Sequence, residues 1–320
     1  MSAPLVLALP SKGRLKEQTE AWLADCGVPL RPLGGDRGYA ARLEGVSDIV
    51  VRLLSASEIA QTLYAGEIHL GVTGEDLLRE LSDDLEARIA LLSPLGFGRA
   101  DLVVAAPKSW IDVETMADVD EVAHLYRART GKRLRVASKY LTQTRSFFAR
   151  HGVTDYRIVE SAGATEGAPA SGAAELVVDI TTTGATLAAN GLKVLKDGLI
   201  LASQAQLAAA LGAPWTGAQL EAARRLARIL EARARARAAA TLTWPAGCEA
   251  AARAALAPLL DQGASNPPHG VLAPSDRLFD LMNALAEAGV GPVTVTRPAY
   301  VFEAASRPIE ALAARLGQKF

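Results

Sequence analysis

An acidic residue followed by small hydroxyl and glycine residues is the clearest chemical pattern in this chain. Asp179 ends an apolar run rich in β-branched residues, and a helix-like segment begins a few positions later. Between them lie Thr182, Thr183, Gly184, Ala185 and Thr186. Free N–H groups at a helix start attract anions, threonine hydroxyls donate hydrogen bonds, and glycine permits close approach. The pattern favours a phosphate site, although ordinary strand–turn–helix connections use the same residue types.

Asp179, the acidic residue beside this loop, indicates which kind of phosphate compound the loop would bind. A carboxylate at a strand end can accept hydrogen bonds from the hydroxyls of a sugar. Asp179 and the loop together therefore indicate a phosphorylated ribose. Glu166 lies in an earlier loop rich in glycine and alanine, where it could hold another sugar hydroxyl. The alternative for that earlier loop is a flexible surface segment.

Cationic side chains follow two other strand-like runs. Lys12 and Arg14 come after the apolar residues 5–9, and they could neutralise a pyrophosphate or a triphosphate. A solvated helix start is the alternative for this pair. Lys139 and Tyr140 follow a later run and offer another cation and an aromatic face. Tyr140 could equally be a packing residue.

Strand-like and helix-like segments alternate along the first half of the chain. Residues 5–9, 48–54 and 68–74 are predicted strands, each followed by a predicted helix. Repeated βα units predict a mainly parallel sheet with ligands at the carboxyl ends of its strands. A second α/β lobe begins with the strand 101–106, and the chain returns to the first lobe with 198–203. Two lobes joined by two crossings form a cleft, the usual place for a ligand.

The domain limits follow from these segments. We expect residues 1–95 and 192–235 in a first lobe, 96–191 in a second, and 236–320 in a C-terminal α+β module. A capping box formed by Thr216 and Gln219 begins a long basic helix that leads to the module. The module contains no catalytic pattern, which favours binding, regulation or assembly. The arginines of the helix indicate a solvated face or a subunit contact.

Composition excludes several classes of function. The net charge of the 320 residues is −1, so neither a nucleic acid nor a membrane surface is expected as a partner. Cys26 and Cys248 fit no metal or redox spacing, and the four histidines do not cluster. The N-terminus lacks a signal-peptide pattern, and no apolar run is long enough to span a bilayer. We therefore predict a cytoplasmic protein.

Together these segments resemble the ATP phosphoribosyltransferase family, which begins histidine biosynthesis. The resemblance is carried by five segments, residues 11–15, 70–76, 95–98, 163–169 and 179–192. The last contains a T-G-x-T-L-x-x-N-G-L pattern that is highly specific to the family. The resemblance implies a two-lobed, type II periplasmic-binding-protein-like α/β core. It also implies the long form, which carries a ferredoxin-like regulatory domain at its C-terminus.

The resemblance further implies a reaction and its site. The enzyme would transfer the 5-phosphoribosyl group of phosphoribosyl diphosphate to N1 of ATP, with Mg²⁺ carried by the substrate phosphates. The threonine–glycine loop would bind the 5-phosphate, Asp179 and Glu166 the ribose hydroxyls, and Lys12 and Arg14 the other phosphates. Lys139, Tyr140 and Gly74 complete the expected substrate contacts. Inhibition by histidine and a homo-oligomer, a dimer or hexamer, are also expected.

Two departures and a rival interpretation accompany this resemblance. His69 stands where the family usually has an acid, and an arginine usual near Ser55 is absent, with Arg52 as a candidate substitute. The C-terminal module matches only loosely. A non-catalytic two-lobed binding protein would share the architecture, because fold alone does not decide function. A phosphoribosyltransferase acting on another base is a lesser alternative.

Overall fold

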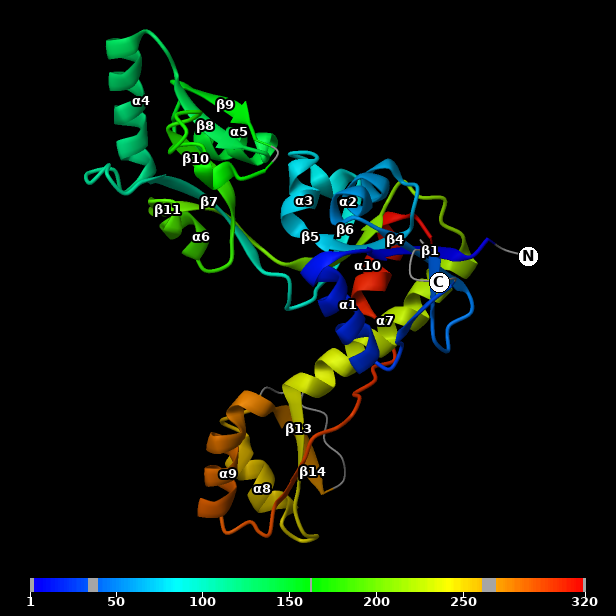
Figure 1. Ribbon diagram of the computed structural model, residues 1–320. Helices are drawn as coiled ribbons and strands as arrows, with labels where there is room; N and C mark the ends of the chain where they lie inside the picture. Colours follow the sequence, from blue (N-terminus) through cyan, green and yellow to red (C-terminus); the bar gives the residue numbers. More distant parts are fainter. Residues whose placement is uncertain (1–2, 34–39, 162, 261–268, 319–320) are drawn as a thin grey trace.

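The computed structural model describes residues 3–33, 40–161, 163–260 and 269–318. Its strands form three separate sheets of seven, five and three strands. We call the parts built on these sheets lobe I, lobe II and the C-terminal domain. In Figure 1 lobe II lies above and to the left of lobe I, and the C-terminal domain lies below both. The predicted two-lobed α/β core with a smaller α+β domain is confirmed.

The sheet of lobe I is parallel at its centre. In spatial order its strands are β2 (Leu30–Pro32), β3 (Ala40–Leu43), β4 (Ile49–Leu54), β1 (Leu5–Pro10), β5 (Leu70–Gly74), β12 (Ala205–Ala210) and β6 (Ile89–Pro94). β1 pairs in parallel with both β4 and β5, as the predicted βα units require. β12 runs antiparallel between β5 and β6. The carboxyl ends of β1, β4 and β5 therefore meet at one edge of the sheet.

Helices cover both faces of the lobe I sheet. They are α1 (Gly13–Asp25), α2 (Ala56–Ala65), α3 (Glu75–Glu80), η1 (Leu85–Ala87), α7 (Gly217–Ala238) and α10 (Arg307–Arg315). Three of them, α1, α7 and α10, bury apolar side chains in one cluster with the sheet, among them Leu23, Leu220 and Ile309. α2 and α3 bury Ile59 and Leu78 in a second cluster. Both faces of the sheet are thus shielded from water, as a parallel sheet requires.

Lobe II has a sheet in which three strands run parallel. Its strands in spatial order are β11 (Leu192–Ser203), β7 (Ala100–Pro107), β10 (Leu176–Thr181), β8 (Leu134–Ser138) and β9 (Tyr156–Glu160). β8, β9 and β10 are parallel, whereas β7 and β11 form an antiparallel pair at one side of the sheet. The helical segments are α4 (Met116–Thr130), α5 (Leu141–Arg150), η2 (Thr165–Gly167) and α6 (Ala185–Ala189). α4 and α5 pack into the main core of this lobe.

The C-terminal domain is a small antiparallel sheet with its helices packed against it. Its strands, in spatial order, are β14 (Gly270–Pro274), β13 (Ala239–Thr243) and β15 (Thr294–Thr296), and its helical segments are α8 (Glu249–Leu256), η3 (Ser275–Arg277) and α9 (Leu278–Glu287). Leu242 of β13, Leu256 of α8 and Leu281 of α9 share one buried cluster. Across the described ranges, no helix combines the length and the apolar character needed to cross a membrane.

Two short crossings join the lobes and lie against each other: the first is residues 95–99, between β6 and β7, and the return crossing is residue 204, between β11 and β12. The backbone N–H of Leu95 donates to the carbonyl of Ala205, and the N–H of Ala205 donates to the carbonyl of Phe97. The return crossing comes later than the domain limits predicted. Residues 192–203 all belong to β11, which pairs with β7 of lobe II, so the chain re-enters lobe I only after Ser203. The reason is that β11 continues as one long edge strand where a boundary at 192 was expected.

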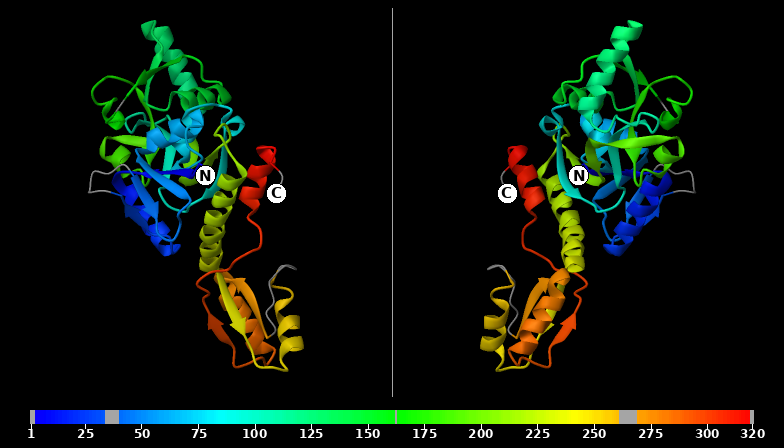
Figure 2. Two further views of the ribbon diagram at one scale, coloured as in Figure 1. Left: turned by 90° about the vertical axis from the view of Figure 1, so that its right-hand side faces the viewer. Right: turned by 90° about the vertical axis from the view of Figure 1, so that its left-hand side faces the viewer.

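The end of the chain also departs from the predicted limits. α10 leaves the C-terminal domain and packs on α7 and β6 of lobe I. Its Ile309 and Leu312 are each only 1% exposed and lie in the lobe I core. Figures 1 and 2 show the returning segment beside α7. The C-terminal domain is consequently inserted between α7 and α10, and the predicted module 236–320 contains a helix of lobe I.

The basic helix α7 uses its arginines within the chain. Its capping box at Thr216 forms as predicted. Arg233 donates to both carboxylate oxygens of Asp25 in α1, at 2.8 and 2.7 Å. Arg233 and Arg235 also donate to the carbonyls of Ala299 and Val301 in the returning segment, each at 2.9 Å. These contacts hold Arg233 and Arg235 against other parts of the same chain.

Candidate active site

The acidic and basic residues predicted in lobe II lie close together. Because β8, β9 and β10 are parallel, the loops that follow them share one edge of the sheet. Burial raises the pKa of the half-buried Asp179 carboxyl above its ordinary value. The Ile180 N–H and the Lys139 ammonium oppose this rise, and the negative charge of Glu166 adds to it. The three predicted side chains therefore influence one another electrostatically.

Asp179 lies slightly earlier in its strand than the sequence suggests. β10 continues to Thr181, so the Asp179 carboxylate projects from within the strand, near its C-terminal end, and not from the loop that follows. One carboxylate oxygen accepts a hydrogen bond from the Ile180 N–H at 2.8 Å. Among the described residues no side chain donates to it, and most of its hydrogen-bonding capacity remains available to a ligand.

The predicted phosphate loop is exposed and internally braced. Gly184 has φ = +73°, a left-handed conformation that favours glycine. Its N–H donates to Thr181 Oγ1 at 2.8 Å, which holds the turn. The side chains of Thr182, Thr183 and Thr186 are exposed.

Helix α6, which follows the loop, presents free donors. The hydrogen bonds of the described chain include no acceptor for the N–H groups of Thr186 and Leu187, at the start of this helix. Such groups carry partial positive charge and point away from the helix. The loop thus offers threonine hydroxyls and free N–H groups side by side, as an anion site requires. The N–H of Ala185, by contrast, makes a long hydrogen bond of 3.4 Å to Thr183 Oγ1.

The first crossing connects this loop to the start of α1. Thr182 Oγ1 donates to the carbonyl of Arg99 at 3.3 Å. One residue earlier, a Cβ on Gly98 would lie 3.0 Å from Leu15 Cδ1 of α1. The crossing is therefore in contact with the phosphate loop on one side and with α1 on the other. Lys12 and Arg14, at the beginning of α1, belong to the same region of the molecule.

Lys12 and Arg14 are exposed cations at the carboxyl edge of lobe I. Lys12 is the N-cap of α1, two residues after the end of β1. Neither cation belongs to an ion pair among the described residues. The Lys12 charge contributes only the smallest part of the lowered pKa of Glu58, which results mainly from hydrogen bonds with Ser55. Both cations are consequently available to the phosphates of a substrate.

For Tyr140 the structure matches the packing alternative and not an aromatic face offered to a ligand. Tyr140 is 1% exposed, and its ring packs in the lobe II core, so the ring is not offered to a ligand. Its hydroxyl donates to Asp76 Oδ2 of α3 in lobe I at 2.7 Å. Lys139 Nζ lies 4.9 Å from the centre of the ring. Tyr140 is thus a packing residue that links the lobes and supports the neighbouring lysine.

Gly74 is likewise buried, and the structure explains it by packing. A Cβ at this position would collide with the carboxylate of Asp76. Asp76 also accepts a hydrogen bond from the Ser203 hydroxyl. The sequence indicates no chemical role for either residue. The only signal for Asp76 is its place after Gly74 in the segment 70–76, and Ser203 offers none. Their contact joins residues 127 positions apart, which a pattern search along the chain does not reveal.

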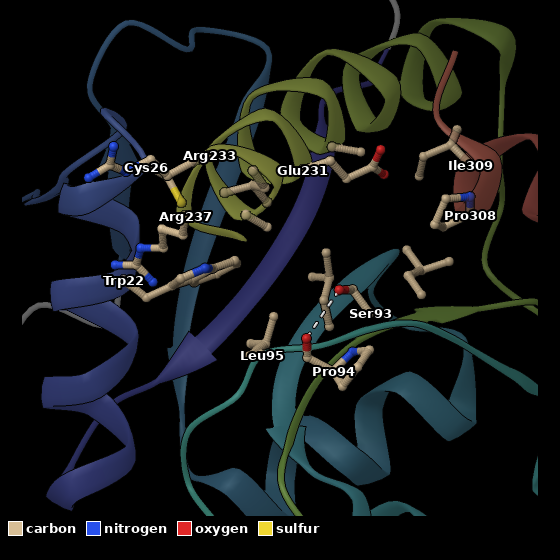
Figure 3. Close-up of a pocket in the computed structure, with 15 residues that line it drawn as sticks. Trp22, Cys26, Ser93, Pro94, Leu95, Glu231, Arg233, Arg237, Pro308 and Ile309 are labelled. Carbon is tan, nitrogen blue, oxygen red and sulfur yellow. Dashed lines mark hydrogen bonds between the residues drawn. The ribbon is translucent and has the colours of Figure 1, made fainter. Parts of the chain in front are cut away.

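A separate pocket lies on lobe I, away from these residues (Figure 3). It has a volume of about 220 Å³ and lies between α1, β6, α7 and α10. Its lining is mainly apolar and includes Trp22, Leu95 and Ile309. Two arginines at its rim, Arg233 and Arg237, are already paired with Asp25 of α1. None of the predicted substrate residues lines this pocket.

Comparison with known proteins decides the family. The family described as HisG: ATP phosphoribosyltransferase matches residues 55–231. A protein named ATP phosphoribosyltransferase from Caulobacter vibrioides (strain NA1000 / CB15N) is 64% identical over 319 residues, covering 100% of both chains. The chain belongs to the ATP phosphoribosyltransferase family. The resemblance drawn from the threonine–glycine loop is thereby confirmed, and the rival interpretation as a non-catalytic binding protein is not favoured.

Other ATP phosphoribosyltransferases match along most of their length. One from Nitrobacter hamburgensis is 50% identical over 313 residues, with 95% of each chain covered. Among solved structures, the ATP phosphoribosyl transferase (HisG:HisZ) complex from Thermotoga maritima is 26% identical. The match covers 64% of this chain and 86% of that chain, with a TM-score of 0.49.

The electrostatic cluster predicts opposite effects of two substitutions on Asp179. Lys139→Met should raise the pKa of the Asp179 carboxyl further, because a nearby cation favours the charged form. Glu166→Gln should lower it, because a like charge is removed. NMR titration of the aspartate carboxyl carbons measures both shifts. Lys132→Met, which removes an exposed lysine elsewhere in lobe II, is the control and should leave the Asp179 titration unchanged.

Proposed function

We propose that this ATP phosphoribosyltransferase transfers the 5-phosphoribosyl group of phosphoribosyl diphosphate to N1 of ATP and releases pyrophosphate. This reaction is the first step of histidine biosynthesis. The observation that carries the site assignment is the half-buried Asp179 beside an exposed loop with free N–H groups at Thr186 and Leu187. The loop suits the negatively charged 5-phosphate of a ribose 5-phosphate, and the neighbouring carboxylate suits the hydroxyls of its sugar ring.

Each part of the site has a distinct role in this proposal. The loop of Thr182, Thr183, Gly184, Ala185 and Thr186 binds the 5-phosphate. Asp179, assisted by Glu166, accepts hydrogen bonds from the ribose hydroxyls and so fixes the ring. Asp179 must be ionised to accept with both oxygens, and the Lys139 charge favours that form. Gly74 and Tyr140 act indirectly, through the packing that surrounds Asp76.

The chemistry requires alignment and charge stabilisation more than a catalytic base. The lone pair of adenine N1 forms the new bond to C1 of the ribose, while the C1–O bond breaks and its electron pair leaves with pyrophosphate. Lys12 and Arg14 stabilise the charge that develops on the phosphates. Holding N1 and C1 in line removes much of the entropic barrier. No side chain has to take a proton from N1 for this step.

Mg²⁺ bound to the substrate phosphates would neutralise part of the negative charge on the departing pyrophosphate. The described residues contain no group of three or more histidine, cysteine, aspartate or glutamate side chains able to hold a metal ion. We therefore assign no protein ligand to the metal. Oxygen atoms of phosphates suit Mg²⁺, which keeps several waters and few protein ligands in many phosphate-transfer sites.

The C-terminal domain is proposed to bind histidine and to regulate a cytoplasmic homo-oligomer, a dimer or hexamer. The domain has its own buried core but none of the proposed substrate residues. Its Phe279 is 79% exposed, as is Ile111 of lobe II at 77%. Exposed apolar side chains of this size suit contacts between subunits. Histidine would inhibit by binding a less active assembly more tightly.

The proposed sugar contact predicts the effect of Asp179→Asn. We expect kcat/KM for phosphoribosyl diphosphate to fall about tenfold or more, since a charged hydrogen-bond acceptor is lost. Steady-state assays with ATP and Mg²⁺ measure this, and other nucleotides in place of ATP test the choice of acceptor. Asp112→Asn, an exposed aspartate of the same lobe, is the control. Equal activity of the two variants would contradict the assignment of Asp179.

The phosphate loop predicts the effect of Gly184→Val. A branched side chain is strained at the left-handed φ of Gly184 and blocks approach to the loop backbone. Binding of phosphoribosyl diphosphate, measured by calorimetry, should be lost. Gly131→Val provides a matched control, because Gly131 has φ = +70° at the end of α4 and also has open space around it. Equal affinity of the two variants would place the phosphate elsewhere.

The inserted C-terminal domain predicts how it can be removed. Deleting residues 240–298 and joining the ends with a short Gly-Ser linker keeps α10 on lobe I. This variant should stay folded and active but lose inhibition by millimolar histidine. Truncation after Ala239 should instead lower the melting temperature, because each buried side chain such as Ile309 or Leu312 contributes roughly 1.5–3 kcal/mol. Inhibition that survives the deletion, or its absence in the full chain, would reject histidine regulation by this domain.

A further inference from the structure

A buried carboxylate lies between the two lobes. Asp76, in α3 of lobe I, is 5% exposed. It accepts hydrogen bonds from the hydroxyls of Ser203 at 2.9 Å and Tyr140 at 2.7 Å. None of the ion pairs in the described chain involves it. Burying a carboxylate without a cation is costly unless hydrogen bonds replace its water, so its position calls for a reason.

The partners of Asp76 come from separate parts of the fold. Ser203 ends β11 at the return crossing, and its hydroxyl also accepts from the Asp76 N–H at 3.0 Å. Tyr140 immediately precedes α5 of lobe II. Gln143 Nε2 of α5 donates to the Asp76 carbonyl at 2.9 Å. The acid therefore contacts both lobes and the crossing that joins them.

A second acid of α3 strengthens this connection. The Glu80 carboxylate accepts from the N–H groups of Thr142 and Gln143 at 2.8 and 3.2 Å, in the first turn of α5. These N–H groups have no partner inside their own helix, and an acidic group there also interacts favourably with the helix dipole. Figure 1 shows α3 and α5 facing one another between the lobes. α3 thereby fixes the position of the segment that begins with Lys139 and Tyr140.

The chain of contacts continues from Tyr140 to the proposed sugar site. Lys139 Nζ lies 4.9 Å from the centre of the Tyr140 ring, within the range of a cation–π interaction. The Lys139 charge in turn favours the ionised form of Asp179. Burial raises the pKa of Tyr140 strongly, and Asp76 adds to the rise, so the hydroxyl stays protonated and keeps donating.

We propose that Asp76 is a positioning residue for the substrate site of lobe II. It holds the Tyr140 hydroxyl, the ring of Tyr140 supports the Lys139 ammonium, and that ammonium is kept beside Asp179. Lobe I thus controls the charge environment of a carboxylate in lobe II. The consequence for substrate binding rests on the sugar-binding role proposed for Asp179.

Tyr140→Phe tests the proposal without altering charge or ring volume. The ring loses its anchor to Asp76, so Lys139 should no longer be held in place. We expect the pKa of Asp179, followed by NMR, to rise. We also expect KM for phosphoribosyl diphosphate to rise about threefold or more, the scale of coupling within one hydrogen-bond network, with a smaller change in kcat. An unchanged Asp179 titration would overturn the proposal.

A double-mutant cycle and a matched variant separate positioning from general stabilisation. In a Lys139→Met background, Tyr140→Phe should no longer shift the pKa of Asp179, because the effect passes through the lysine. Ser203→Ala removes the other hydroxyl from Asp76 but leaves the Tyr140 contact. It should lower the melting temperature and leave the Asp179 titration as in the natural chain. A shift with Ser203→Ala equal to that with Tyr140→Phe would show a merely structural clamp and overturn the proposal.

The titration needs no substrate, so it judges this inference separately from the proposed function. If Asp179→Asn keeps full activity while Tyr140→Phe still shifts the Asp179 pKa through Lys139, the positioning is upheld and the sugar-binding role fails. If Asp179→Asn is inactive but Tyr140→Phe shifts neither the pKa nor KM, the reaction assignment stands and the positioning role is overturned.

Discussion

Parallel pairing of strands within each lobe determines where the proposed substrate residues lie. Neighbouring parallel strands end at the same edge, so the loops after β8 and β9 bring Lys139 and Glu166 close to Asp179 near the end of β10. The same rule puts Lys12 and Arg14 at the corresponding edge of lobe I. The antiparallel pair β7 and β11 contributes no proposed substrate side chain and serves instead to connect the lobes. The chemistry of the site thus follows from strand direction before any side-chain detail.

A second constraint places the carboxyl edge of the lobe I sheet relative to that of the lobe II sheet. The crossings are hydrogen-bonded to each other through their backbones, and Asp76 binds groups from both lobes beside them. Proteins with two lobes often bind ligands at such an interface. Here the contact is a buried carboxylate held by hydroxyl groups, which is directional and sensitive to small displacements. The relative placement of the lobes therefore depends on a few polar contacts as well as on packing.

Local patterns sufficed for much of the fold. The β1, β4 and β5 strands, the α7 capping box and the threonine–glycine loop were all predictable, because each carries its own periodicity or turn chemistry. β12 was not predictable, since its sequence AQLAAA has the composition of a helix. It forms a fully buried strand because small side chains fit between β5 and β6. The sequence left the role of Tyr140 open and did not reveal that α10 packs on lobe I, because contacts distant in sequence decide both positions.

The return of the chain along α7 has a mechanical consequence. A domain on a single linker can both swivel and bend, whereas one attached by two neighbouring segments cannot turn about their common axis without winding them around each other. Here α7 and the residues leading to α10 are fastened together by Arg233, Arg235 and the backbone of Val301. A tilt of the C-terminal domain would therefore displace both α7 and α10, and both pack against the sheet of lobe I.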